Sequence, residues 1–600
     1  MSYLITFGII LIFAITLTIL FKKRIEEVII IGIVEIIVII YCSGLLDNLR
    51  AGIIAVEILA IMQLIYLIIQ IIKRHKQKKL KPLLQNIFTP GLMLYAVLFI
   101  GSIIINRNRI FEHHDEFIHW AVIVKNMFMY NTYGTNIETI VRFNEYPPFT
   151  AIFQYLFLET NGAYAEDIIM IAQNILYFSI IVSITKNVKW DKSLKSLIVI
   201  IPLIIFIPII FYENFYLEIL VDGILGIMFA YTIFSAFEAD ENLIFKYVKI
   251  LVGSIMLCLT KTSGIALAVL AIVIILIKCV IDKKKHNLKK EIRLLIGVIL
   301  ISILLTSIWY VKVSNSEKRW DFTQYVKKEN MQKDEQLHIA ENFVKATLSK
   351  QDITERGFTV FSITLLYLCF NLYAAKKYDI NGYKYYSMTM IISIPIYLVA
   401  LLISYSAIFD IAEAKHLACF DRYVSTILLA YPIFQILVLS RYIEVKYYKE
   451  KCLLMISLIF ILLPMKTIEE KYINGKSYIL TSNEERENCT KIKEYKEVLK
   501  EDDKILFITG LEGNLGTLVL MNKYEIMPLN ITQSMVGIFI SQKNFENIVE
   551  DFDYMYVYRM REEDKEKIKN SFTDNEINDD TLYKVICTDE EIKLEKIKNE

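Results

Sequence analysis

Long apolar runs separated by short polar connectors occupy most of the chain up to residue 465. With the interfacial residues at its ends, each run approaches the ~20 residues that an α-helix needs to cross a bilayer. The pattern therefore predicts a mainly α-helical, polytopic membrane domain over residues 1–465 with about fourteen spans. The expected spans are Tyr3–Phe21, Val28–Tyr41, Ile53–Ile72, Leu92–Ile105, Ile168–Thr185, Leu194–Phe211, Ile219–Phe237, Val248–Leu259, Ile265–Ile281, Leu294–Val311, Phe358–Ala375, Met388–Tyr405, Val424–Leu439 and Leu453–Pro464.

Basic residues gather in five of the connectors, and their order along the chain predicts the orientation of the spans. Cytoplasmic loops of membrane proteins are enriched in Lys and Arg, so these connectors are expected inside the cell. That parity puts both termini outside, together with a first long loop at 106–165 and a polar second loop at 312–356, which is expected to form amphipathic surface helices. The basic connectors are Lys73–Lys81, Lys186–Lys195, Lys283–Arg293, Lys376–Lys384 and Arg441–Lys451.

Beyond residue 465 the apolar runs become short and charges become dense. Alternation of short apolar strands with helical segments is typical of a small α/β domain. We therefore expect residues 466–600 to form such a domain on the extracytoplasmic side. Its expected elements are helices at Glu484–Leu499, Phe545–Val549 and Glu563–Asn570 and strands at Lys504–Thr509, Tyr554–Tyr558 and Leu582–Cys587.

Composition supports a lipid environment and removes several classes of function. The chain is 55% hydrophobic, which exceeds the usual 45–50% of soluble domains. Its net charge of +1 and position-sorted charges give no sign of nucleic-acid binding. The 8 cysteines are scattered without a CxxC pair, so a zinc site or redox dithiol is not expected. Heavy use of Ile and Lys is typical of an AT-rich bacterial genome.

The first long outer loop contains a polar stretch, Asp115-Glu116-Phe117-Ile118-His119-Trp120, directly after a predicted span. Carboxylates so close to a bilayer are costly unless they face water or a functional cleft. Asp115 and Glu116 are candidate general bases, and a divalent metal held by the two remains open. If the stretch is an α-helix, Asp115 and His119 share one face. An ordinary solvated connector is the alternative.

Two cationic side chains are candidates for binding a phosphate group. Lys261 lies between two apolar runs, where a lysine is costly unless it is paired or functional. Arg422 follows Asp421, and arginine is well suited to bidentate phosphate contacts. Snorkelling of Lys261 to the interface and pairing of Arg422 with Asp421 are the structural alternatives.

Tyr146, Pro147 and Pro148 precede an apolar helix, and two prolines favour an extended entry into its first turn. An acidic pair in the first outer loop, followed by a Pro-Pro motif, resembles the GT-C superfamily of polytopic glycosyltransferases. The similarity is greatest to the protein O-mannosyltransferase and aminoarabinose-transferase branch, the family-39-like glycosyltransferases. Phe149 stands where that pattern has Leu, and four spans precede the acidic pair where the mannosyltransferases have one.

The resemblance implies an inverting enzyme that transfers a hexosyl or pentosyl group from a polyprenyl-phosphate donor outside the bacterial cytoplasmic membrane. Asp115 would be the general base on the acceptor hydroxyl, and Glu116 would assist it through a metal or a hydrogen bond. His119 would orient Asp115, with a structural histidine at the interface as the alternative. Lys261 and Arg422 would hold the donor phosphate. The acceptor would be an envelope glycan, lipid or protein, and no cofactor is required by the pattern.

Three other classes of membrane protein fit the same composition. A transporter or flippase of lipid-linked glycans would also contain acidic residues within its spans, such as Glu35, Glu57 and Asp222. A polymerase or ligase would use the same kind of lipid-linked donor, and a non-catalytic envelope scaffold would need none. Inverted repeats, which are typical of transporters, are not evident in the sequence.

Overall fold

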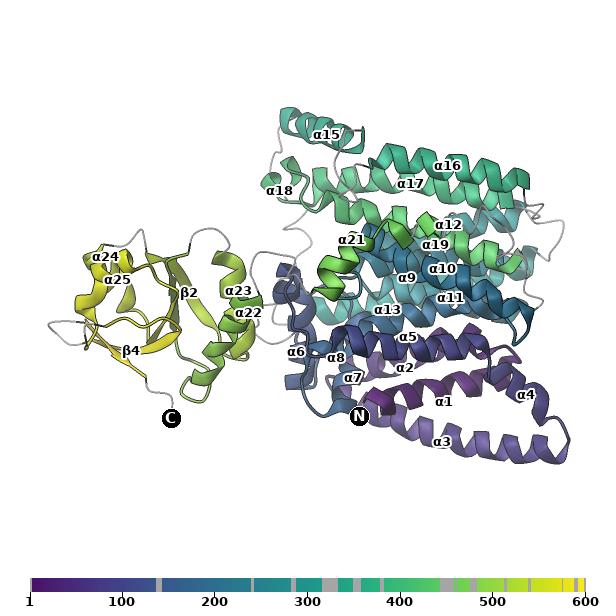
Figure 1. Ribbon diagram of the computed structural model, residues 1–600, viewed down its shortest axis with the longest axis horizontal. Helices are drawn as coiled ribbons and strands as arrows, with labels where there is room; N and C mark the ends of the chain where they lie inside the picture. Colours follow the sequence, from purple (N-terminus) through teal and green to yellow (C-terminus); the bar gives the residue numbers. More distant parts are fainter. Residues whose placement is uncertain are drawn as a thin grey trace. The chain divides into compact units, whose positions relative to one another are not determined.

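The computed structural model describes residues 3–135, 143–238, 242–281, 288–315, 333–348, 358–377, 383–442, 458–459, 461–474, 483–511, 515–537, 541–574, 576–587 and 592–597. The chain divides into two compact units (Figure 1). The membrane unit comprises residues 1–110, 124–136 and 144–472, and the C-terminal unit comprises 111–123, 137–143 and 473–600. The first unit is helical and the second contains a β-sheet.

Most long helices of the membrane unit lie on the apolar runs of the sequence, whereas the helices Lys333–Leu348 and Ile411–Lys415 are polar. The helices of this unit are α1 (Tyr3–Phe21), α2 (Ile25–Gly44), α3 (Leu49–Lys76), α4 (Leu80–Ile87), α5 (Pro90–Asn106), α6 (Ala121–Tyr130), α7 (Phe149–Asn161), α8 (Glu166–Ile181), α9 (Leu197–Phe211), α10 (Asp222–Phe237), α11 (Leu243–Cys258), α12 (Thr262–Ile281), α13 (Leu288–Ser314), α15 (Lys333–Leu348), α16 (Val360–Lys377), α17 (Tyr383–Ala407), α18 (Ile411–Lys415), α19 (Phe420–Tyr442) and α21 (Met465–Thr467). Short 3₁₀ helices cover Val182–Asn187 and Lys192–Ser196, and a π-helical turn covers Ile468–Ile473.

Within the described residues, eight helical segments are long and apolar enough to cross a membrane, which makes the chain an integral membrane protein. They are Tyr3–Phe21, Leu49–Lys76, Leu80–Asn106, Glu166–Asn187, Ser193–Phe211, Thr262–Ile281, Leu288–Ser314 and Ser387–Ala407. The shorter apolar helices Asp222–Phe237 and Val360–Lys376 add to the bundle. The expected total of about fourteen spans stays a prediction, and half of the run Leu453–Pro464 falls outside the described residues.

Burial separates core helices from peripheral ones. The apolar segment of α8 is 100% buried within the protein, whereas only 28% of α3 and 22% of α13 is buried. The exposed faces of α3 and α13 carry Ile and Leu side chains such as Ile61, Ile65 and Leu300. Apolar faces of this extent on helices of membrane-spanning length are suited to contact with lipid tails.

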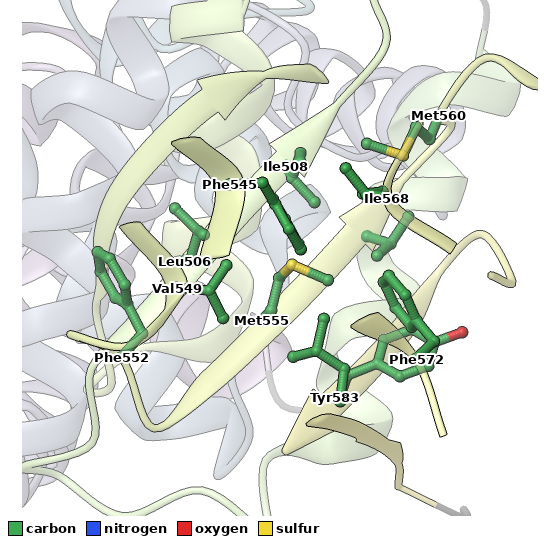
Figure 2. Close-up of a cluster of buried hydrophobic side chains, with 12 residues drawn as sticks. Leu506, Ile508, Phe545, Val549, Phe552, Met555, Met560, Ile568, Phe572 and Tyr583 are labelled. Atoms are coloured by element: carbon green, nitrogen blue, oxygen red, sulfur yellow. The ribbon is translucent and has the colours of Figure 1, made fainter. Parts of the chain in front are cut away.

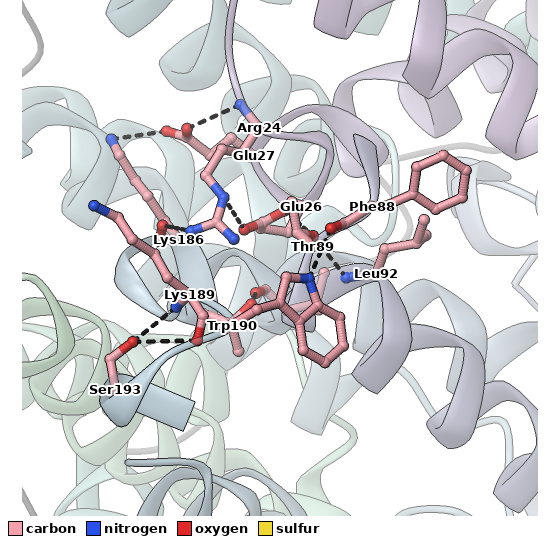
Figure 3. Close-up of polar contacts among 12 residues, drawn as sticks. Arg24, Glu26, Glu27, Phe88, Thr89, Leu92, Lys186, Lys189, Trp190 and Ser193 are labelled. Carbon is pink, nitrogen blue, oxygen red and sulfur yellow. Dashed lines mark hydrogen bonds and ion pairs between the residues drawn. The ribbon is translucent and has the colours of Figure 1, made fainter. Parts of the chain in front are cut away.

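A network of buried charges joins the ends of several core helices (Figure 3). The Lys186 ammonium group lies 2.7 Å from the Glu27 carboxylate and 2.8 Å from that of Glu238. Arg24 pairs with Glu26 at 3.0 Å, and the Thr89 hydroxyl donates to Glu26 at 2.7 Å. Such pairing compensates the desolvation of each charge, so it favours one arrangement of the helix ends. We call Arg24, Glu26, Glu27, Lys186, Glu238 and Lys249 the Glu238 network.

The C-terminal unit is built on a five-stranded mixed sheet in the order β2-β1-β3-β4-β5. β1, β2 and β3 are parallel, and β4 and β5 pair antiparallel at one edge. The strands are β1 (Ile505–Thr509), β2 (Ile531–Val536), β3 (Tyr554–Tyr558), β4 (Thr581–Cys587) and β5 (Ile592–Lys596). The helices are α22 (Asn483–Cys489), α23 (Leu515–Ile526), α24 (Gln542–Val549) and α25 (Glu562–Ile568), with 3₁₀ turns at Thr490–Tyr495 and Lys569–Ser571.

One face of this sheet packs against α24 and α25 (Figure 2). Leu506 and Ile508 of β1 and Met555 of β3 meet Phe545 and Val549 of α24, and all five side chains are buried. Each buried aliphatic or aromatic side chain contributes roughly 1.5–3 kcal/mol to folding. The unit therefore has a hydrophobic core of its own.

The predicted α/β character of the C-terminal part is confirmed, with three elements added. β1, β3, β4, α24 and α25 lie where short apolar runs predicted them. Helix α23 and strands β2 and β5 were not predicted. The expected helix at Glu484–Leu499 is instead α22 followed by a 3₁₀ turn. In the second outer loop, the described residues 333–348 form α15, and residues 316–332 and 349–357 lie outside the described part.

Candidate phosphate site and acidic segment

Lys261 and Arg422 meet at one carboxylate in the membrane unit. The Lys261 Nζ atom lies 2.8 Å from Oδ1 of Asp222, and the Arg422 Nε atom lies 3.3 Å from Oδ2 of the same residue. The rings of Tyr146 and Tyr423 flank the Lys261 ammonium group, with centroids 5.7 and 5.2 Å from Nζ. We call these five residues the Asp222 cluster. Arg422 thus has an ion-pair partner other than Asp421, the partner that the structural alternative gave it.

Close packing of α10 on α19 produces this meeting. A Cβ atom added to Gly226 would lie 2.2 Å from the carbonyl oxygen of Thr426, so only glycine allows this approach. One helical turn earlier on each helix stand Asp222 and Arg422. The hydroxyl of Tyr212 donates to the Arg422 carbonyl at 2.8 Å and lies 3.1 Å from the Thr426 hydroxyl, which fixes the start of α19 further.

The Pro-Pro segment, Tyr146 to Pro148, lies beside the Asp222 cluster. Pro147 and Pro148 are buried, and Pro148 immediately precedes α7. The backbone N–H of Phe149 donates to the carbonyl of Leu259 at 2.7 Å, two residues before Lys261. The segment is therefore fixed to the turn between α11 and α12, and this contact explains how Tyr146 comes to lie over Lys261.

Lys261 remains a cation despite its burial. Burial alone opposes the charged form, but the Asp222 carboxylate beside it raises the pKa of Lys261 above its usual value. A permanently charged lysine and an arginine, lined by tyrosine rings and hydroxyls, can bind an anion through charge-assisted hydrogen bonds. A phosphate group could join these cations or replace Asp222 on them.

Glu145, directly before Tyr146, is a buried carboxyl group in the same unit. It is 6% exposed, and among the described residues its Oε2 atom has no hydrogen-bond partner. Its backbone carbonyl accepts from the Trp309 indole N–H at 2.8 Å. Burial raises the pKa of Glu145 to about 7. A carboxyl group in this range can exchange a proton near neutral pH.

The acidic segment lies in the C-terminal unit, where its two carboxylates differ. Residues Glu116–Trp120 form a π-helical turn that continues into α6. Oε2 of Glu116 accepts the backbone N–H groups of Glu112 and His113 at 3.0 and 2.8 Å, and the residue is 1% exposed. Asp115, in contrast, is half-buried at the start of the turn. The side chain of Glu116 thus stabilises the backbone just before it, and Asp115 is the more accessible of the two carboxylates.

The π-helical turn changes the expected faces of the segment. The expectation that Asp115 and His119 share a face assumed regular α-helical spacing, but the N–H of Ala121 donates to the carbonyl of Glu116, five residues earlier. His119 is 3% exposed, and its ring packs against Trp120 at 4.7 Å and Phe143 at 6.3 Å. Its surroundings are therefore largely aromatic. π-helical turns are rare and occur often at functional sites.

Asp222 is the site residue that the sequence did not identify as such. It was noted only as an acid within an apolar run, although that position was itself the signal, because an isolated carboxylate in such a run needs a partner.

The sequence left open a divalent metal held by Asp115 and Glu116. Within the described ranges no group of three or more His, Cys, Asp or Glu side chains is arranged to hold a metal ion.

Comparison with protein-family models, curated proteins and solved structures found no match to this chain. The resemblance to GT-C glycosyltransferases therefore stays a prediction that depends on the motifs of the sequence.

Proposed function

We propose that the protein is a membrane glycosyltransferase of GT-C type, with about fourteen spans, that uses a polyprenyl-phosphate sugar donor on the extracytoplasmic side. The observation that carries the proposal is the Asp222 cluster. Two cations separated widely in the sequence share one buried carboxylate, beside the Pro-Pro segment that the resemblance singled out.

In this proposal Lys261 and Arg422 bind the phosphate of the donor, and they stabilise the negative charge that develops on it as the sugar leaves. Asp222 keeps both cations charged and oriented when no donor is bound. The rings of Tyr146 and Tyr423 give the site an apolar wall suited to the first carbons of a lipid chain.

Asp115 accepts the proton of the acceptor hydroxyl, and Glu116 supports it through the backbone bonds that shape the segment. The new glycosidic bond forms as the bond between the sugar and the phosphate breaks. The phosphate remains on the lipid and the proton remains on Asp115 until it is released to water. The acceptor is an envelope glycan, lipid or protein with a free hydroxyl group.

The test is transfer of a labelled sugar from a polyprenyl-phosphate donor by the purified protein in lipid nanodiscs. Lys261→Ala and Arg422→Ala should each weaken donor binding roughly tenfold to a hundredfold, since each removes a charge-assisted contact. Lys312→Ala is the matched control, because Lys312 forms an exposed ion pair with Asp47 at 2.5 Å.

Absence of transfer by the wild type with any lipid-phosphate or lipid-diphosphate sugar would overturn the proposal. Movement of an intact lipid-linked glycan between leaflets, without cleavage, would indicate a flippase instead. Extension of a glycan that stays on its lipid carrier would indicate a polymerase.

A further inference from the structure

The acidic segment packs onto the C-terminal unit although more than three hundred residues separate them in the sequence. Phe111–Ile123 belongs to the same compact unit as the β-sheet, and its contacts are made with α22 and α23. This association differs from the expectation that residues 466–600 alone form the C-terminal domain.

Arg486 of α22 lies at the centre of the association. It is 1% exposed, and its Nε–H group donates to the carbonyl oxygen of Phe111 at 3.0 Å. Its guanidinium carbon lies 5.1 Å from the ring centroid of Phe117 and 5.9 Å from that of Tyr524. Arg486 also forms an ion pair with Glu525 of α23.

The neighbours of Arg486 make the arrangement specific. Phe117 meets Tyr524 edge to face at 5.3 Å, and Phe111 meets the same ring at 6.5 Å. Near the start of α23, the Thr517 hydroxyl lies 2.8 Å from Nδ1 of His114. Residues 111, 114 and 117 are thus each held by a different contact, and Asp115 lies between the second and third of them.

Burying the charged side chain of Arg486 has a high desolvation cost, which its hydrogen bond and ion pair must offset. Removing a charge from water costs several kcal/mol unless hydrogen bonds and an opposite charge compensate it, and an apolar pair of similar volume is often as stable. A structural core between α22 and α23 would therefore not require Arg486. Its hydrogen bond to the Phe111 carbonyl is the interaction that an apolar replacement could not supply.

From this geometry we infer that the C-terminal unit is the device that holds the acidic segment in place, with Arg486 as the positioning residue. The clamp is defined by Arg486, Tyr524 and Glu525 on the C-terminal side and by Phe111 and Phe117 on the segment. The inference that the clamp holds the acidic segment in place does not depend on the proposed function. Its consequence for catalysis, which is the placement of Asp115, rests on the proposed function.

The experiment is hydrogen–deuterium exchange of the full-length protein in nanodiscs, with peptides that cover residues 111–120. The double substitution Arg486→Met with Glu525→Gln removes both buried charges together, and Lys493, which also pairs with Glu525, is 50% exposed and can be solvated by water. We expect amide exchange in 111–120 to become roughly tenfold to a hundredfold faster, as expected for loss of a charge-assisted bond. Peptides from β1 and β3 should exchange as in the wild type.

Two controls separate the clamp from general destabilisation. Lys491→Met removes an exposed ion pair with Asp580 at 2.7 Å in the same unit and should leave exchange in 111–120 unchanged. Tyr524→Leu, which keeps an apolar side chain but removes the ring over Arg486, should accelerate exchange in 111–120 by a smaller factor.

Unchanged exchange in 111–120 in the double variant would overturn the inference, and so would acceleration spread equally over the whole C-terminal unit. Where the wild type catalyses transfer, the double variant should lose turnover with an unchanged KM for the donor. A rise in KM as large as the loss in turnover would assign Arg486 to donor binding and contradict the positioning role. If the wild type shows no transfer, the proposed function fails while the exchange result still decides on the clamp.

Discussion

The Asp222 cluster and the acidic segment show opposite relations between sequence and role. Asp115 and Glu116 are neighbours in the chain, yet Glu116 accepts two backbone N–H groups while Asp115 stays half-buried at the start of the turn. Lys261 and Arg422 are far apart in the chain, yet both pair with Asp222. Adjacent residues of one type therefore need not share a function, and distant ones can.

The largest effect is expected when Asp115 and Glu116 are substituted one at a time and the two variants are compared. Asp115→Asn keeps the side-chain shape but removes the proposed base, and turnover should fall about 10²–10⁴-fold, the usual contribution of a general base. Glu116→Ala leaves two N–H groups without their acceptor and should lower the free energy of unfolding by roughly 1–3 kcal/mol. Steady-state transfer and thermal melting measure the two effects.

One result would contradict the different roles that we give to Asp115 and Glu116. If Glu116→Ala lost as much turnover as Asp115→Asn at an unchanged melting temperature, both carboxylates would act in the chemistry. Donor binding should be nearly retained in Asp115→Asn, because the proposed function gives the phosphate contacts to Lys261 and Arg422.

The next effect tests whether the Asp222 cluster differs from a purely structural set of buried charges. In the Glu238 network Lys186 pairs with both Glu27 and Glu238. Lys186→Met leaves Glu27 without this ion pair, while Glu238 keeps Lys249. Breaking a fully buried pair typically costs about 3–5 kcal/mol of stability, which is the upper bound for the partly exposed Lys186. We expect a marked drop in melting temperature but no selective change in the KM for the donor. A selective rise in KM would place the network in the binding site.

Glu145 should make the stability of the membrane unit depend on pH. Because its folded-state pKa is raised from 4.5 to about 7, the protein holds this proton more tightly when folded. The stabilisation is fully present below pH of about 4.5 and is lost as the pH rises through about 7. The difference corresponds to roughly 3 kcal/mol over that range.

Glu145→Gln removes this titration and should flatten the decline in melting temperature between pH 4.5 and 7. The variant should be more stable than the wild type at the upper end of the range. Glu562→Gln, at a carboxylate that is 85% exposed, serves as the control and should follow the wild-type curve. An unchanged slope in Glu145→Gln would mean that Glu145 does not titrate in this range.

The smallest expected effect is the coupling between Lys261 and Arg422. Because both contact Asp222, their substitutions should not be independent. The double variant should bind the donor more tightly than the sum of the two single losses predicts, with a coupling of about 1 kcal/mol. A double-mutant cycle of donor binding measures it, and strict additivity would mean that the two cations act on different parts of the donor.

Much of the architecture could be predicted from the sequence because apolar length alone carries the signal. The runs Tyr3–Phe21 and Ile265–Ile281 lie within helices α1 and α12, and the short run ending at Thr509 is strand β1. Apolar periodicity could not separate a π-helical turn from an α-helix at Glu116–Trp120, since the two differ by one residue per hydrogen-bonded ring.

The parts of the site that could not be predicted depend on contacts between distant residues. Lys261 and Arg422 were each singled out because a charge beside apolar runs requires a reason, but nothing in their sequence neighbourhoods indicates a common partner. Arg486 lies in a polar, charge-rich stretch where a basic residue is unremarkable. Only its burial against Phe111 and Phe117 distinguishes it from the many exposed charges around it.

The π-helical turn determines where Asp115 lies around the helix axis relative to the residues of α6. Each residue of an α-helix advances by about 100° around the axis. Deleting Ile118 from the turn would restore regular spacing, while Phe111 could remain on its partners only if the segment rotated. A length change of a single residue would thus turn the carboxylate away from its present direction without altering any side chain of the site. The number of residues between Phe111 and α6 is therefore as much a part of the site as their chemical nature.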